Sequence, residues 1–168
     1  MSTNPLTLER ALSERELSWG ERGGTLKGIQ PLDLVIQASF HADPRRIFHA
    51  LTVPEYLETW MALPDASVNC HVVALRVANS FRIDFYRSNA LDASVTGSFR
   101  IQKQDKLLFT WSKFGESDDV HSIVDIVLQG SVGRCTLELR HSGLRSGSES
   151  RWHQRMWSAS LQNLAMLF

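Results

Sequence analysis

The fold is decided by residues 121–168, which read HSIVDIVLQGSVGRCTLELRHSGLRSGSESRWHQRMWSASLQNLAMLF. Apolar and polar residues alternate over His121 to Gln129 and again over Gly133 to His141, which is the period of strands with one buried face. The link Gln129-Gly130-Ser131 is too short for a parallel crossover. The two strands are therefore predicted to form an antiparallel hairpin.

A long helix is predicted to follow this hairpin. The Ser/Gly-rich stretch Ser142 to Ser148 is expected to be a turn, and Ser146 and Glu149 have the spacing of a capping box at the start of a helix. One face of the helical pattern carries Trp157, Leu161, Leu164 and Phe168. Twenty residues of helix span about 30 Å, which is enough to cross a whole sheet.

Strand patterns also fill most of the chain before this hairpin. Further strands are predicted over residues 32–40, 68–77, 80–87, 93–102 and 106–114. After the first of them, Asp43-Pro44 is expected to cap and open one short helix, and Pro54 to open a second. Short links between the later strands predict an antiparallel meander.

The predicted fold class is α+β, a helix-grip fold. A curved seven-stranded antiparallel sheet surrounds the long C-terminal helix, and two short helices follow the first strand. The sheet must bury its apolar face, and the last helix is long enough to cover it. Because a strongly twisted sheet curves away from a straight helix, an internal cavity is expected between them.

The length of 168 residues predicts one folded domain, placed at residues 31–168. Residues 1–30 are predicted to be an N-terminal extension, either a loosely docked arm or an arm that packs on a second subunit in a homodimer. Cys70 and Cys135 lie in apolar strand patterns and are expected to be reduced core residues.

Charge and hydropathy narrow the classes of partner. Eighteen basic and eighteen acidic residues cancel, so nucleic acid is not an expected partner. The start of the chain lacks the pattern of a signal peptide, and no apolar run approaches the length of a membrane span. A cytoplasmic location is the expectation.

Several segments together resemble a known family. They are ADPRRIFHAL at 42–51 with VPEYLETW at 53–60, VTGSF at 95–99 with KLLFTW at 106–111, and CTLELRHSGL at 135–144 before the helix that carries Trp157. In this order they resemble the SRPBCC or START-like superfamily, also called birch-pollen-allergen-like. Within it, they are similar to the domains homologous to the heat-shock-protein ATPase activator.

The resemblance extends from Leu34 to Phe168 and implies a helix-grip fold with a cavity for a small lipophilic ligand. Relatives include transport proteins, cyclases and a cochaperone, so it implies no single activity. The chain departs from the family pattern at Val53, where Asp or Asn is common, and at Met156, where Gly is common. Met156 is expected to narrow the cavity or to change how the helix sits on the sheet.

Large apolar side chains on the predicted inner faces are the candidate ligand-binding residues. They are Trp60, Phe81, Phe85, Phe99, Phe109, Trp111, Trp157 and Leu161. The same side chains could serve only as core, and both roles can hold at once because the wall of a cavity is also core.

Three polar residues are candidates for catalysis. Arg82 and Asp84 alternate with phenylalanines along the strand 80–87 and are expected to face solvent; in the reverse register they would lie inside the cavity, suited to proton transfer. His141 ends the last strand, either at the mouth of the cavity or hydrogen-bonded to nearby backbone. The six histidines show no metal-binding spacing, and neither a metal nor a cofactor is expected.

Three functions remain open at this point. The first is non-enzymatic binding of a small hydrophobic molecule, lipid-like or an aromatic metabolite. The second is a cyclase or dehydratase that acts on a carbonyl compound, and the third is a cochaperone-like interaction protein in the stress response. Catalysis needs an inward polar group with a perturbed pKa, whereas a cochaperone needs an exposed patch.

Overall fold

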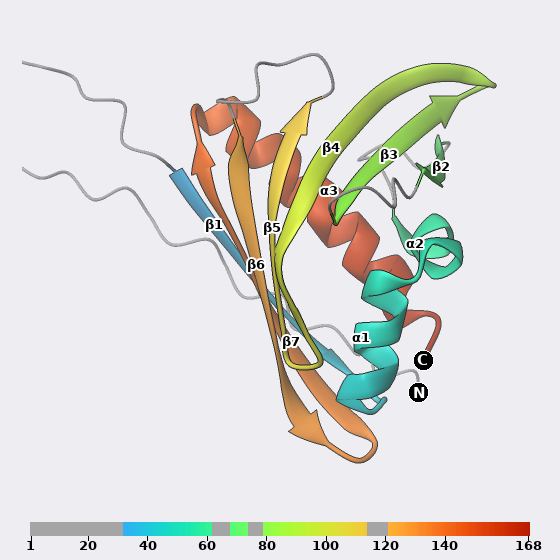
Figure 1. Cartoon of the computed structure of the whole chain (residues 1–168), viewed down its shortest axis with the longest axis vertical. Helices are drawn as coiled ribbons and strands as arrows, with labels where there is room; N and C mark the ends of the chain where they lie inside the picture. Colours follow the sequence, from blue (N-terminus) through green and yellow to red (C-terminus); the bar gives the residue numbers. More distant parts are fainter. Residues whose placement is uncertain (1–31, 62–67, 74–78, 114–120) are drawn as a thin grey trace, which may run out of the picture.

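The computed structural model describes residues 32–61, 68–73, 79–113 and 121–168. The elements in chain order are β1 Leu32–Phe40, α1 Pro44–Thr52, α2 Pro54–Trp60, β2 Val68–Val73, β3 Ser80–Arg87, β4 Ala90–Lys103, β5 Lys106–Lys113, β6 Ser122–Ser131, β7 Arg134–Leu144 and α3 Gly147–Ala165. Figure 1 shows a strongly curved sheet with α3 crossing behind it, and α1 and α2 beside one end of α3. The predicted N-terminal extension and its role in a homodimer lie outside the described residues.

The described strands form one seven-stranded sheet in the order β1-β7-β6-β5-β4-β3-β2. Every neighbouring pair is antiparallel. Between β3 and β4 the chain turns at Ser88 and Asn89, whose φ angles of 48° and 66° suit a two-residue hairpin on a right-twisted sheet. The predicted curved antiparallel sheet and long C-terminal helix are confirmed.

The last hairpin strand is longer than its sequence pattern indicated. A turn was expected from Ser142, but β7 continues to Leu144, which pairs with Leu32 of β1. Gly143 makes this continuation possible, since its φ of +83° is a backbone conformation that favours glycine. Pairing with β1 thus extends β7 beyond the residues of β7 that alternate between apolar and polar.

Capping at the two main helices differs. In α3 the predicted Ser146 cap is confirmed, since its hydroxyl accepts from the backbone N–H of Glu149 at 3.1 Å. The Glu149 carboxylate accepts from the N–H of Arg145 at 2.8 Å, one residue before the N-cap. In α1, Asp43 occupies the N-cap position but its side chain does not cap the helix. Its carboxylate accepts instead from the backbone N–H of Gly133, which ties α1 to the β6–β7 turn.

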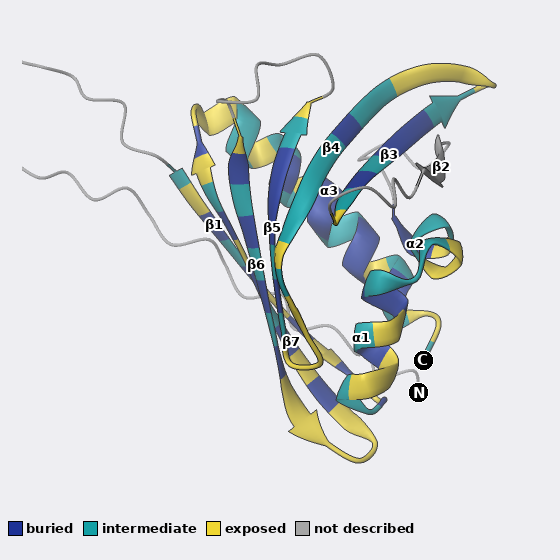
Figure 2. Cartoon of the chain, in the orientation of Figure 1, coloured by how far each residue is buried: buried dark blue, intermediate teal, exposed yellow. Residues whose placement is uncertain are grey.

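The core lies between the concave face of the sheet and α3. Figure 2 shows buried segments in β3, β5, β6 and α3. The inward side chains of β5 are Leu107, Phe109 and Trp111, all buried. Cys135 is buried as a free thiol, and this burial raises its pKa. The side chain of Cys70 is not among those the structure describes. No helix in the described ranges is long and apolar enough to cross a membrane.

Candidate functional site

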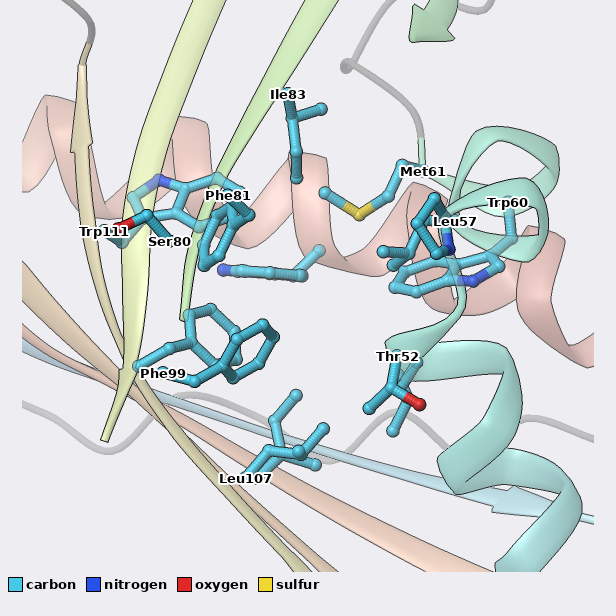
Figure 3. A pocket seen from close by; sticks show the side chains of 15 residues that line it. Thr52, Leu57, Trp60, Met61, Ser80, Phe81, Ile83, Phe99, Leu107 and Trp111 are labelled. Atoms are coloured by element: carbon cyan, nitrogen blue, oxygen red, sulfur yellow. The ribbon is translucent and has the colours of Figure 1, made fainter. Parts of the chain in front are cut away.

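An apolar cavity of about 110 Å³ lies between the concave side of the sheet and the three helices. Its lining comprises Leu51, Thr52, Pro54, Leu57, Trp60, Met61, Ser80, Phe81, Ile83, Phe99, Leu107, Phe109, Trp111, Ile126 and Trp157. Figure 3 shows two facing walls: Phe81, Phe99 and Trp111 from the sheet on one side, and Leu57, Trp60 and Met61 on the other.

The sheet wall is a continuous set of aromatic rings. Phe81, Phe99 and Phe109 form a triangle with ring centroids 5.4 to 5.6 Å apart. Trp111 extends this set at 6.3 Å from Phe109, and Trp157 of α3 follows with its ring centroid 5.1 Å from that of Trp111. These separations are in the range of favourable aromatic pairs, so the wall is a rigid aromatic surface.

Gly97 of β4 allows one of these rings to lie against the sheet. A Cβ atom at this position would lie 2.0 Å from the backbone oxygen of Thr110 and 2.4 Å from the Phe81 ring. Both separations are far below van der Waals contact. The absence of a side chain at Gly97 therefore gives the Phe81 ring its place in the cavity wall.

Several polar side chains of the lining form hydrogen bonds within the protein. Trp60 donates its indole N–H to the backbone oxygen of Ala50 at 2.8 Å, and the Thr52 hydroxyl donates to Phe48 O at 2.8 Å. The Ser80 hydroxyl pairs with that of Ser98 at 3.2 Å. Among the described residues that line the cavity, none is acidic, basic or histidine. The wall therefore favours an apolar occupant.

Behind this wall lies His141, which the structure places in a fully buried hydrogen-bonded chain. The indole N–H of Trp157 can only donate, and it reaches His141 Nδ1 at 3.1 Å, so Nδ1 is the acceptor. His141 Nε2 then carries the proton and donates to the Ser122 hydroxyl at 2.7 Å. That hydroxyl donates to the backbone oxygen of Trp111 at 3.0 Å. We call this chain, Trp157–His141–Ser122–Trp111, the tryptophan relay.

Burial determines the charge state of His141. Burial and, to a lesser extent, the neighbouring His153 lower the pKa of His141 from 6.5 to about 3. His153 packs on it with ring centroids 4.6 Å apart, donates from Nδ1 to the Glu149 carbonyl at 2.9 Å, and has its own pKa lowered by burial. His141 is thus a neutral, fully bonded side chain away from the mouth of the cavity. The expectation that backbone would satisfy it is corrected: its partners are side chains of Trp157 and Ser122.

Arg82 and Asp84 lie on the other face of the sheet. Phe81 and Ile83 of the same strand line the cavity, so the alternating residues point away from it. Arg82 Nε lies 2.7 Å from Asp84 Oδ1, and the Ser94 hydroxyl donates to the same oxygen at 2.5 Å. Both side chains point away from the cavity, as expected, but Asp84 does not face solvent, since it is only 6% exposed. Its bonds to Arg82 and Ser94 explain why a carboxylate tolerates this burial.

Of the eight predicted ligand-binding residues, Phe85 and Leu161 are buried in the core and do not line the cavity. The other six line it: Trp60, Phe81, Phe99, Phe109, Trp111 and Trp157. Sequence reasoning missed Ile83 and Leu107, although strand alternation places them on the same faces as Phe81 and Phe109. Thr52, Pro54 and Ser80 lie at element ends, where periodicity gives no signal. Met156 is fully buried and is not part of the lining.

The family of the chain follows from comparison with known proteins. The family described as "Activator of Hsp90 ATPase homolog 1-like protein" matches residues 41–168. The chain belongs to this family. The resemblance identified from the sequence segments is thereby confirmed. Among curated proteins, the comparison found no match.

Solved structures share the fold of this family member. Protein CV1439 from Chromobacterium violaceum is similar, with a TM-score of 0.70, 18% identity, and coverage of 80% of this chain and 96% of that one. The AHSA1 protein from Silicibacter pomeroyi gives a TM-score of 0.65, 22% identity, and coverage of 80% and 96%. DynU16, described as belonging to the dynemicin biosynthetic locus, gives 0.63, 23%, and coverage of 80% of this chain and 46% of that one. At these identities the likeness concerns the fold.

Proposed function

We propose that this protein binds a small, compact, apolar molecule, best a single aromatic ring, in the cavity between the sheet and the helices. The observation that carries the proposal is the chemistry of the wall: six aromatic side chains face one space, and none of the described lining residues is charged. Such a surface offers contact area and ring stacking to an apolar guest but no partner for a buried charge.

The size of the cavity narrows the ligand class. An engineered apolar cavity of about 150 Å³ in another protein stays dry and takes up benzene. The cavity here, at about 110 Å³, is of the same order. A long acyl chain would need far more space, so of the two ligand types expected from the sequence, an aromatic metabolite fits better than a lipid.

The enzymatic alternative has less support from the geometry. A cyclase or dehydratase requires a proton donor or acceptor within reach of its substrate. Arg82 and Asp84 face away from the cavity, and His141 is engaged on both ring nitrogens. The similarity to DynU16 lies at the level of the fold and adds no catalytic group. A cochaperone role is supported only by the description of the family. We therefore propose non-enzymatic binding.

Benzene titration followed by NMR tests the proposal. The wild-type protein should show saturable shifts for the side chains that line the cavity. Ile83→Trp places a larger side chain in the cavity and should abolish these shifts. Tyr86→Trp is the matched control, because Tyr86 lies on the same strand but outside the lining, and it should leave the titration unchanged.

Two results would contradict the proposal. One is the absence of saturable binding in the wild-type protein. The other is equal benzene binding by Ile83→Trp and Tyr86→Trp when circular dichroism shows both variants folded. Either would mean that the space is not the ligand site.

A further inference from the structure

The tryptophan relay joins the Trp157 ring to the backbone carbonyl of Trp111 through two residues, His141 and Ser122, that do not line the cavity. Trp157 belongs to α3 and Trp111 to β5, while the two residues between them, His141 and Ser122, belong to β7 and β6. All four are buried. The relay therefore crosses four elements and couples the helix to the sheet behind the wall.

Each bond of the relay has one possible direction. The Trp157 indole can only donate and the Trp111 carbonyl can only accept, so the protons between them must all point the same way. Inverting the His141 ring, or moving its proton to Nδ1, would leave the buried indole N–H without an acceptor. An unsatisfied buried donor is costly, so the relay stabilises one side-chain arrangement.

That arrangement defines the shape of one end of the cavity. The indole planes of Trp111 and Trp157 meet at 49° with centroids 5.1 Å apart, and both rings line the space. The torsion that turns a tryptophan ring about its Cβ–Cγ bond has broad preferences, so packing and hydrogen bonds must fix it. The bond to His141 Nδ1 supplies this restraint for Trp157.

We propose that His141 is a positioning residue which, through the relay, holds the Trp157 ring at a fixed angle to Trp111, so that this end of the cavity is a slot of fixed shape that selects flat rings over puckered rings of the same carbon number. This inference rests on the proposed binding function. A rigid slot favours a guest that already has the shape of the slot, because no side chain has to lose conformational freedom when the guest binds. Loss of the restraint would let the Trp157 ring tilt and accept thicker guests.

The test compares benzene with cyclohexane and uses three variants of the full chain. His141→Phe keeps a ring but removes both relay bonds. His141→Gln retains an acceptor and a donor, bonded to the same carbon atom, and serves as the rescue. His153→Phe is the matched control, because His153 is buried against His141 yet bonds to the Glu149 carbonyl and not to an indole. The readouts are the ratio of the two dissociation constants and the hydrogen exchange of the Trp157 indole proton.

In His141→Phe the preference for benzene should fall about tenfold, the equivalent of one lost hydrogen bond, and the Trp157 indole proton should exchange at least about tenfold faster. His141→Gln should recover most of both, and His153→Phe should change neither. The indole exchange needs no ligand, so it tests the positioning role even if the wild-type protein binds neither compound, a result that would overturn the proposed function alone.

Unchanged preference and unchanged indole protection in a folded His141→Phe protein would overturn the inference. If that variant does not fold, Ser122→Ala takes its place, because it removes the next relay bond with a smaller change of volume. Ser122→Ala should then lower the preference for benzene and speed exchange of the Trp157 indole proton. Wild-type values for both in a folded Ser122→Ala protein would likewise overturn the inference.

Discussion

Two polar clusters lie on either side of the same curved sheet, and they differ in almost every physical respect. On the outer face, Arg82, Asp84 and Ser94 form a charged cluster around one carboxylate oxygen. On the inner side, His141 and Ser122 belong to a neutral relay between two tryptophans. The outer cluster reaches solvent, since the Arg82 side chain is 26% exposed and Ser94 is half-buried, whereas His141 is completely buried.

The difference shows how a polar residue near a cavity can leave the cavity apolar. Asp84 is bonded to Arg82 and Ser94, and strand alternation points it outward. His141 remains on the inner side but is uncharged, because burial lowers its pKa to about 3. Neither cluster delivers a charged group to the lining, which agrees with the proposed binding function.

The largest expected effect is on the inner relay. His141→Phe leaves the Trp157 N–H and the Ser122 hydroxyl without their partner, so the free energy of unfolding should fall by about 3 kcal/mol. Urea denaturation measures this value. A loss below about 1 kcal/mol would show that the relay contributes little to stability.

A somewhat smaller effect is expected from acid. The pKa of His141 is about 3 in the folded protein and 6.5 when unfolded, so below pH 6.5 the unfolded chain binds a proton that the folded one does not. The contribution of His141 to the free energy of unfolding should be present above about pH 6.5 and be lost as the pH falls. From His141 alone, the free energy of unfolding should decrease by about 2 kcal/mol between pH 7 and pH 5. The lowered pKa of His153 acts in the same direction.

Urea titrations at pH 5, 6 and 7 test this dependence. His141→Gln, which has no titrating group at this position, should show a flatter profile than the wild-type protein. Equal profiles for the two proteins would mean that His141 does not carry the acid sensitivity.

The smallest effect is expected on the outer face. Asp84→Asn removes the charge opposite Arg82 but keeps an oxygen for the Ser94 hydroxyl, and Arg82 can be solvated from its exposed side. The free energy of unfolding should fall by about 1 kcal/mol. The dissociation constant of benzene should not change, because Asp84 does not line the cavity. A clear change in that constant would show that the outer face of the sheet affects the cavity, which the account excludes.

Much of the fold was predictable because its signals are local. Alternation located strands such as Ser80–Arg87 to the residue, and Ser146 with Glu149 located the start of α3. The end of β7 could not be predicted in this way, because pairing with β1 extends the strand to Leu144. The identity of a partner strand is a tertiary property that alternation along one strand does not contain.

For the site, alternation indicated which aromatic side chains face inward, and six of the eight predicted residues line the cavity. It could not show that the cavity ends before Phe85 and Leu161, which depends on how closely α3 approaches the sheet. The relay was also out of reach: His141, Ser122 and Trp157 are far apart in the sequence, and only the assembled fold brings their polar atoms within 3.1 Å.

A crystal structure of the protein soaked in bromobenzene tests the central claim most directly, because the anomalous signal of bromine locates the guest without ambiguity. The account predicts one bromine peak between the aromatic wall of Phe81, Phe99 and Trp111 and the facing residues Leu57 of α2 and Met61, which follows it. A cavity without bromine, or with bromine only elsewhere in the protein, would contradict it.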